Sequence, residues 1–307
     1  MPDALTIAGV RFHLSGCSAA DPCLFPAAFG PFLNVAGEAD LVCEVVCLGP
    51  DPALAATTPE PDRPWSFTVG AEGTATLVRR ADDGVALWRM RATAPADRVE
   101  IAWHPQRFEP VYGRYERAWN SGLGLTLLVF RLHAAGGLVF HGSAARLDAQ
   151  GVLCAGVSGS GKSTIARLLD AAGATVLTDE RPVVRRWPPP AAATDAATAA
   201  TFRVHGSPWP SSAGFARREA APLRRIYFLE HGAEDRIQTL APPEAFRRLI
   251  QVATIPWQEP ALFDPCLATA EALLAGVPCA VLAFRPTAAV VDAIRRDLAR
   301  AAGEDAA

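Results

Sequence analysis

The stretch from Gly156 to Thr164 combines a lysine with three glycines and four hydroxyl side chains. It follows the pattern Gly-x-x-x-x-Gly-Lys-Ser/Thr, a loop whose backbone N–H groups turn inward around phosphates. Lys162 is expected to reach the β- and γ-phosphates, and the Ser163 hydroxyl is expected to help hold Mg²⁺. The pattern therefore predicts a P-loop that binds a nucleoside triphosphate, most simply ATP with Mg²⁺. The expected contacts are Gly156, Ser158, Gly159, Ser160, Gly161, Lys162, Ser163 and Thr164.

Two adjacent carboxylates, Asp179 and Glu180, follow Lys162 by 17 and 18 residues. A helix of about three turns and a short strand would return the chain to the phosphate side over that length. Mg²⁺ requires anionic oxygen ligands, and phosphoryl transfer to an alcohol gains from a group that accepts its proton. We therefore expect Asp179 to be catalytic and both Asp179 and Glu180 to be metal ligands. The alternative is an acidic cap or a solvent-facing turn.

His141 is a third candidate because a hairpin leads into the P-loop. If Asp148 to Gly151 form the hairpin loop, Leu147 pairs with Val152, and His141 then lies opposite Ser158. This pairing places the imidazole beside the phosphates, where it could polarise Asp179 or touch the γ-phosphate. A slip of one residue would turn the side chain to the other face. An antiparallel hairpin before the loop also differs from the parallel sheet of most P-loop proteins.

Secondary-structure patterns support this placement. Apolar runs predict strands over 138–147, 152–157, 175–177 and 226–229, and the spacing of apolar residues predicts helices over 162–172, 243–252 and 288–302. Residues 188–200 are low in complexity and are expected to form a flexible loop. Arg224 and Arg225 precede a strand, where a structural salt bridge is the more usual outcome and a phosphate contact the alternative.

Residues 1–110 read as a β-rich accessory or substrate-recognition domain, with strands expected over 41–47, 66–69, 74–78 and 85–92. A connecting helix is expected within 111–136, from the spacing of apolar residues between Tyr115 and Ala134. Residues 137–307 then form the P-loop domain. The expected fold class is α/β, in the mixed α+β arrangement.

The composition favours a globular protein with a net charge of −3, which gives no reason to expect nucleic acid as the main partner. Met1 to Leu5 lack the pattern of a signal peptide, and the most apolar stretch is too short to span a bilayer. We therefore expect no membrane partner and a cytoplasmic location. The seven cysteines, an odd number, are expected to be reduced thiols.

The segment from His141-Gly142-Ser143 through the P-loop to Asp179-Glu180 resembles the catalytic domain of HPr serine kinase/phosphorylase. It looks closest to the HPr-kinase-like proteins of peptide natural products, including kinases of lasso-peptide precursors. The resemblance covers about 137–285 and is specific at the P-loop and the acidic pair. It implies a fold akin to the nucleotide domain of phosphoenolpyruvate carboxykinase, ATP-dependent transfer to a serine hydroxyl, and the multimers that the family often forms, hence a homo-oligomer.

The resemblance also implies roles for individual residues. Lys162 and Ser163 match the phosphate and Mg²⁺ residues, Asp179 the catalytic carboxylate and His141 the active-site histidine, so that Asp179, His141 and Lys162 form the expected catalytic set. Glu180 stands where the family usually has a second Asp. The family's Arg-Gly-Leu-Gly-type signature is replaced here by Val204-His205-Gly206-Ser207, which puts phosphorolysis and HPr itself in doubt. His205 and Gly206 could line an acceptor site or form a plain surface turn.

These features lead to one main hypothesis and two alternatives. The main hypothesis is an ATP- and Mg²⁺-dependent kinase of a peptide or protein serine, with the C-terminal serine of a ribosomal, lasso-type precursor peptide as a candidate acceptor. The first alternative is a kinase of a small metabolite hydroxyl, which needs only a different acceptor pocket. The second is a protein that senses ATP or acts as a scaffold without catalysis.

Overall fold

The computed structural model describes residues 3–18, 25–36, 39, 41–62, 64–70, 74–93, 97–106, 109–111, 114–116, 122–188, 201–256 and 260–304. The chain divides into two compact units, Met1–Arg131 and Leu132–Ala307. The division falls inside the segment 111–136 that the sequence analysis expects to connect two domains. The predicted flexible loop 188–200 lies outside the described residues except for Pro188.

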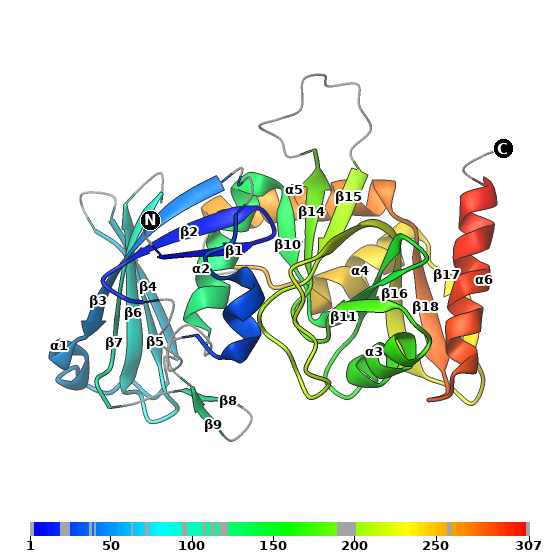
Figure 1. The fold of residues 1–307 in the computed structure, drawn as a ribbon. Helices are drawn as coiled ribbons and strands as arrows, with labels where there is room; N and C mark the ends of the chain where they lie inside the picture. Colours follow the sequence, from blue (N-terminus) through cyan, green and yellow to red (C-terminus); the bar gives the residue numbers. More distant parts are fainter. Residues whose placement is uncertain are drawn as a thin grey trace. The chain divides into compact units, whose positions relative to one another are not determined.

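The first unit is dominated by strands. They are β1 (Asp3–Ile7), β2 (Val10–Ser15), β3 (Leu41–Pro50), β4 (Trp65–Val69), β5 (Thr74–Arg80), β6 (Ala86–Thr93), β7 (Arg98–Trp103), β8 (Glu109–Val111) and β9 (Arg114–Glu116). The first seven form one sheet in the order β1-β2-β3-β7-β6-β5-β4, and β8 and β9 form a separate hairpin (Figure 1). The four strands predicted between residues 41 and 92 are confirmed as β3 to β6.

Two predictions for this unit are corrected. The connecting helix is α2 (Leu123–Leu132), which is shorter than the predicted span, because residues 114–116 are a strand and Gly122, at φ 110°, precedes the first turn. The short helices η1 (Ala27–Phe32) and α1 (Pro52–Ala55) were not predicted. Cys17 and Cys47 are joined in a disulfide, whereas reduced thiols were expected.

The second unit alternates strands with longer helices. Its strands are β10 (Gly137–Val139), β11 (Gly142–Leu147), β12 (Gln150–Ala155), β13 (Thr175–Thr178), β14 (Val183–Trp187), β15 (Thr201–His205), β16 (Ala220–His231), β17 (Arg236–Thr239) and β18 (Cys279–Phe284). Its helices are η2 (His133–Ala135), α3 (Lys162–Ala171), α4 (Pro242–Val252), α5 (Pro260–Gly276) and α6 (Ala289–Glu304). The coarse expectation of a mixed α/β chain is confirmed.

The sheet of this unit is mixed and has β16 at its centre. Seven strands follow the order β10-β14-β15-β16-β12-β11-β13, and β18 pairs with both β16 and β17. β12 and β18 run parallel to β16, whereas β11 and β12 form an antiparallel hairpin. The carboxyl ends of the three parallel strands therefore meet at one edge of the sheet, where the P-loop leaves β12.

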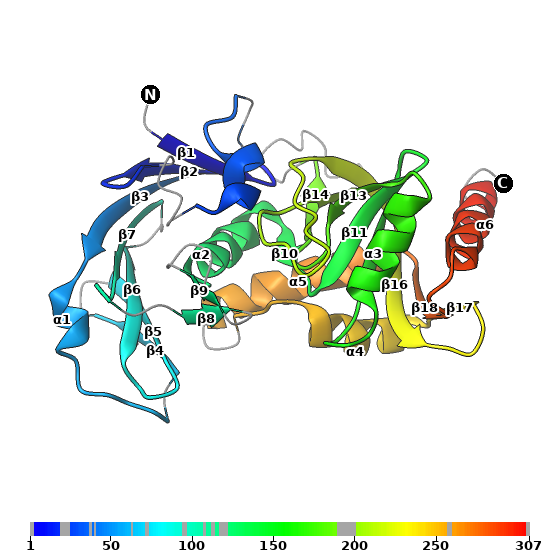
Figure 2. The ribbon, with the colours of Figure 1, turned by 60° about the horizontal axis from the view of Figure 1, so that its bottom comes forward.

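Helices cover both faces of this sheet because its central strands are apolar on both sides. Leu153 and Ala155 of β12 pack in one core with α4 and α5, and Val152 and Cys154 pack in the other with α3 and α6. α3 lies alongside β11 (Figure 2). α5 was missed in the sequence because it is apolar on nearly every side, which hides the helical period. Among the described helices, none combines the length and apolar character needed to cross a bilayer.

The β11–β12 hairpin has a tighter turn than predicted. Leu147 pairs with Gln150, so only Asp148 and Ala149 form the turn, with φ angles of 48° and 67°. Both angles lie in the left-handed region, as a two-residue type I′ hairpin requires. The predicted four-residue loop is therefore wrong. The pairing shifts by two residues, which keeps every side chain on its predicted face.

The strain at this turn predicts a stabilising substitution. Left-handed backbone costs an L-residue about 1–2 kcal/mol, and glycine escapes that cost while losing about 0.4–1 kcal/mol through its freer unfolded chain. Ala149→Gly is expected to raise the free energy of unfolding by about 0.5 kcal/mol, measured by urea denaturation. The matched control is Ala299→Gly within α6, which should lose about 1 kcal/mol. A loss at both positions would contradict the left-handed turn.

Candidate functional site

The P-loop begins directly after β12 and ends where α3 begins. Gly159 and Gly161 have φ angles of 81° and 96°, which L-residues rarely adopt. A Cβ at Gly156 would lie 2.3 Å from the Ser160 hydroxyl, and a Cβ at Gly161 would lie 2.8 Å from the Phe284 ring. The glycines therefore serve both the turn and its close packing. The loop continues directly into the amino-terminal turn of α3, whose unpaired N–H groups favour binding of an anion.

Lys162 lies against this loop and is 7% exposed. Its ammonium donates a hydrogen bond to the carbonyl of Val157, at 2.8 Å. Burial lowers the pKa of Lys162, while the nearby charge of Glu180 opposes part of that shift. The result is a partly desolvated cation held at the loop, where its attraction to an anion is stronger than in water.

Backbone hydrogen bonds connect His141 to the loop and to the acidic pair. The N–H of Gly156 donates to the His141 carbonyl, at 3.2 Å, and the N–H of Gly142 donates to the Glu180 carbonyl, at 3.1 Å. His141 therefore lies opposite Gly156 and not opposite Ser158, as the corrected hairpin register requires. The prediction that His141 lies beside the P-loop is consistent with this placement, although the residue opposite it is different.

The side chain of His141 faces Glu180. The imidazole Nε2 lies 3.4 Å from Glu180 Oε1, and the Arg181 guanidinium lies 3.5 Å from the same oxygen. Glu180 is 7% exposed. Burial raises the pKa of Glu180, but the hydrogen bond with His141 and the charges of Arg181 and Lys162 outweigh it, and the net shift is downward. Glu180 is therefore an ionised, nearly buried carboxylate at neutral pH.

Asp179 has a different environment from its neighbour. Its carboxylate is fully buried and accepts backbone N–H groups from Ser211, at 3.1 Å, and Phe215, at 3.2 Å, on Oδ1, and from Ala213, at 2.8 Å, on Oδ2. Both oxygens are thus engaged by one loop. This geometry favours a positioning role for Asp179. Its sequence-based role as proton acceptor or metal ligand stays a prediction that these contacts do not support.

The loop that Asp179 holds is also fixed at other points. Gly206 donates its N–H to the Glu219 carbonyl, and a Cβ at Gly206 would lie 2.0 Å from the Arg217 carbonyl. Arg167 of α3 donates to the Ser212 carbonyl at 2.8 Å. Gly206 therefore has a packing role, and His205 is a half-buried member of β15 paired with Val183. Neither contact indicates an acceptor site at these two residues.

The remaining P-loop residues divide by burial. Ser160 is buried, and its hydroxyl has no hydrogen-bond partner among the described residues. Ser158 is exposed, while Ser163 and Thr164 are half-buried in the first turn of α3. The described residues contain no cluster of three or more His, Cys, Asp or Glu side chains that could hold a metal ion.

One residue at the loop was missed in the sequence. His231, the last residue of β16, donates from Nε2 to the Gly159 carbonyl at 2.8 Å. The predicted strand 226–229 ends at Leu229, and His231 therefore lies outside it. The available signal was that the apolar run 226–229 continues into two polar residues without a turn residue. A strand that continues to His231 reaches the P-loop.

Comparison with known proteins identifies no family: neither the models of known protein families nor the curated proteins include a match to this chain.

The depressed pKa of Glu180 predicts a pH dependence of stability. Because the folded pKa lies below the ordinary value of 4.5, its contribution is fully present above that pH and is lost as pH falls through the folded pKa. The difference in unfolding free energy between the wild type and Glu180→Gln, measured by urea denaturation, should therefore change on acidification below 4.5 in the direction that favours the variant. Glu271→Gln, on the exposed side of α5, is the matched control. A difference independent of pH would contradict this assignment.

The contacts of Asp179 predict a local effect on the loop. Asp179→Asn replaces an accepting oxygen by an N–H₂ group that faces backbone donors, and it should lower the unfolding free energy by about 2 kcal/mol. Trypsin should then cleave faster after Arg217 or Arg218, which are exposed in this loop. Glu271→Gln, on the exposed side of α5, is the control, and its cleavage rate should match the wild type. Equal rates for all three proteins would show that Asp179 does not hold the loop.

Proposed function

We propose that this protein is a kinase that transfers the γ-phosphoryl group of ATP to a serine hydroxyl of a peptide or protein. The proposal rests on one observation: three ionisable side chains lie together at the P-loop. Lys162 is buried against the P-loop, His141 is tied to Gly156, and Glu180 interacts electrostatically with both side chains. A loop that only binds nucleotide has no need for an imidazole–carboxylate pair beside the phosphates.

The P-loop and α3 would bind the phosphates. The backbone N–H groups around Gly159 and Gly161, together with the positive end of the helix dipole, favour anionic oxygens. Lys162 would exchange its bond to the Val157 carbonyl for the β- and γ-phosphate oxygens. Its charge would then offset the charge that develops on the transferring group.

The donors at the site fit Mg²⁺. Mg²⁺ is usually held by one or two carboxylates together with substrate phosphates and waters. Glu180 is an ionised, nearly buried carboxylate, and Ser163 supplies a hydroxyl in the first turn of α3. These two residues would hold the ion, which when bound neutralises charge on the β- and γ-phosphates.

The His141–Glu180 pair would remove the proton from the acceptor. In the transfer, a bond forms between the serine oxygen and the γ-phosphorus, and the bond from that phosphorus to the bridging oxygen of ADP breaks. We assign the serine proton to the imidazole of His141, since Nε2 faces Glu180 and the carboxylate stabilises the imidazolium that forms. Asp179 acts through the loop 211–215 as a positioning residue.

The finer fold assignment is part of the same proposal. The antiparallel β11–β12 hairpin leads into the P-loop, and β16 and β18 run parallel to β12 on its other side. This mixed arrangement is the feature that favours a phosphoenolpyruvate-carboxykinase-like or HPr-kinase-like domain over the all-parallel P-loop folds. The choice of a peptide serine, with a C-terminal serine as the first candidate, rests on the sequence resemblance.

The kinase proposal is tested with peptide pairs. Serine peptides, including peptides that end in serine, are incubated with ATP and Mg²⁺ next to the same peptides with alanine at that position. We expect mass spectrometry to find one added phosphate on serine peptides only. His141→Ala and Glu180→Gln should lower the rate about 10²–10⁴-fold, because each removes part of the proton acceptor.

Nucleotide binding provides the control for these variants. His141→Ala should still bind a fluorescent ATP analogue, Lys162→Ala should bind it more weakly, and Glu271→Gln should match the wild type in both assays. ATP binding without phosphorylation of any peptide, while a small hydroxyl metabolite gains phosphate, would overturn the peptide acceptor. Bound ATP with no phosphorylated product of either kind would overturn the kinase and favour a sensor or scaffold.

A further inference from the structure

The second unit contains a cavity of about 560 Å³ at the edge of the sheet opposite the P-loop. The cavity is lined by residues at the amino end of β12, in the first half of β16 and just before β18, and by the last two turns of α6. The P-loop follows the carboxyl end of β12. Arg225 in the cavity and His231 at the P-loop lie six residues apart on β16, a separation of about 20 Å along a strand. The cavity is therefore distinct from the proposed kinase site.

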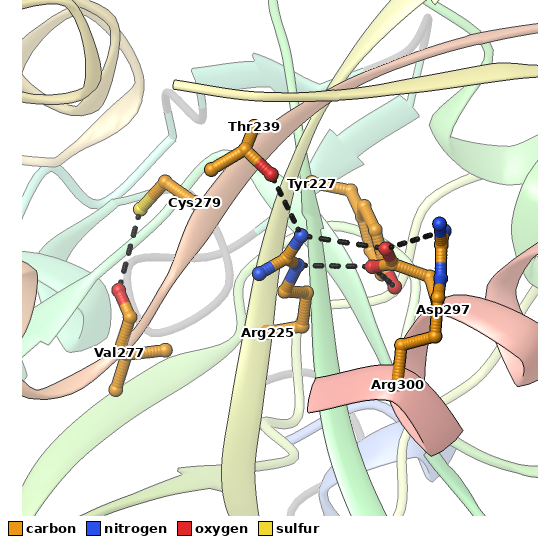
Figure 3. Close-up of polar contacts among 7 residues, drawn as sticks. All are labelled: Arg225, Tyr227, Thr239, Val277, Cys279, Asp297 and Arg300. Atoms are coloured by element: carbon orange, nitrogen blue, oxygen red, sulfur yellow. Dashed lines mark hydrogen bonds and ion pairs between the residues drawn. The ribbon is translucent and has the colours of Figure 1, made fainter. Parts of the chain in front are cut away.

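A buried arginine and aspartate form one wall of the cavity (Figure 3). Arg225 Nε lies 3.0 Å from Asp297 Oδ2, and Arg225 Nη2 donates to Asp297 Oδ1 at 3.4 Å and to the Thr239 hydroxyl at 3.3 Å. Arg225 and Asp297 are 7% and 5% exposed. The salt bridge that the sequence analysis favoured for this arginine pair is confirmed at Arg225.

Asp297 receives more donors than one salt bridge supplies. Tyr227 donates its hydroxyl to Oδ2 at 2.9 Å, and Arg300 donates to Oδ1 at 3.2 Å. Burial raises the pKa of Tyr227, so its hydroxyl stays a neutral donor. Both carboxylate oxygens are therefore occupied, and Asp297 has little capacity left to neutralise a further positive charge.

Positive charge remains on the cavity wall after this pairing. The lining holds the guanidinium groups of Arg225 and Arg300, which share the single carboxylate of Asp297. Nη1 of Arg225 makes no hydrogen bond or ion pair within the described part of the chain, and in Figure 3 it points toward the side of Val277, which also lines the cavity. A buried cation with an open donor favours an anionic partner.

Other residues of the lining are apolar, and together they are called the apolar wall here. They are Leu223, Ile237, Leu274, Val277, Pro278 and Leu298. An inorganic ion would leave this surface in contact with water. A ligand with an anionic head and a short aliphatic part would contact both walls, since burial of each methylene contributes to affinity.

We propose that this cavity binds a small organic anion, a carboxylate or a phosphate monoester with a short aliphatic part. Arg225 and Arg300 hold the anionic head, and the apolar wall contacts the carbon chain. A salt bridge with only a structural role would connect α6 to β16. It would leave no guanidinium nitrogen without a hydrogen bond and no excess positive charge in a cavity. Binding here does not depend on whether the protein is a kinase.

Calorimetry with butyl phosphate, valerate and inorganic phosphate tests the proposal on the full chain. Lys162→Ala is used as the background so that phosphate binding at the P-loop is weakened. We expect butyl phosphate or valerate to bind with a dissociation constant below about 1 mM, and the tighter of the two identifies the head group. Inorganic phosphate should bind about tenfold more weakly than butyl phosphate, because it lacks the buried methylenes.

Two variants of α6 separate this site from nonspecific charge effects. Arg300→Gln removes a guanidinium of the cavity wall and should weaken binding about tenfold. Arg296→Gln removes the same charge from an exposed position one turn earlier, outside the cavity lining, and should have no effect. Both positions are exposed, so neither variant is expected to unfold the protein. Arg225→Lys, checked for folding by circular dichroism, should also weaken binding.

Several results would overturn the proposal. One is a dissociation constant weaker than about 10 mM for every anion tested. Others are equal binding by the Arg300→Gln and Arg296→Gln variants, or binding of neutral butanol as tight as that of butyl phosphate. Equal affinities for inorganic phosphate and butyl phosphate would exclude the organic ligand. Binding in the wild type that disappears in Lys162→Ala would assign all of it to the P-loop.

Discussion

The carboxylate of Asp179 accepts three backbone N–H groups from one loop, and the arrangement of the P-loop edge depends on this contact. Backbone donors in an irregular loop have no strand partners, so a buried carboxylate is an effective way to satisfy several of them. The loop 211–215 is thereby fixed next to the end of β13. Glu180 follows in the chain and is left with its side chain toward His141 and Lys162.

Two neighbouring carboxylates thus have opposite surroundings. Asp179 is surrounded by amide donors that belong to the fold, whereas Glu180 is surrounded by three cationic or ionisable side chains. The difference does not come from residue type, since both are acids at the end of one short strand. It comes from which of the two side chains turns toward the loop and which turns toward the P-loop. In the proposed kinase, the first carboxylate shapes the site and the second takes part in it.

Much of the second unit follows from local sequence. The P-loop, the helix after it and the hairpin before it carry strong local signals, in the glycines, in the apolar period of α3 and in the apolar runs of β11 and β12. Strand pairing between distant segments carries no such signal. The position of β16 next to β12, which brings His231 to Gly159, depends on packing over more than seventy residues of chain.

The site was only partly predictable for the same reason. The P-loop motif and the hairpin before it were enough to predict Lys162, His141 and Glu180 as site residues. The partners of Asp179 could not be predicted, because they lie more than thirty residues away in a loop without a sequence pattern. The turn at Asp148 and Ala149 was misjudged because neither residue is glycine, the usual mark of left-handed backbone. A salt bridge of Arg225 was predicted, but its partner Asp297, 72 residues later in the chain, could not be identified from the sequence.

The position of β16 between two partner strands affects local unfolding of the second unit in solution. Residues 226–228 of this strand are paired on both sides, with β12 and with β18, and their side chains belong to the two cores. Their amide hydrogens can exchange with solvent only when one of these ladders separates. Separation of β16 from its neighbours would therefore disturb both ends of the strand, the end with Arg225 and the end with His231, together with the strand that precedes the P-loop.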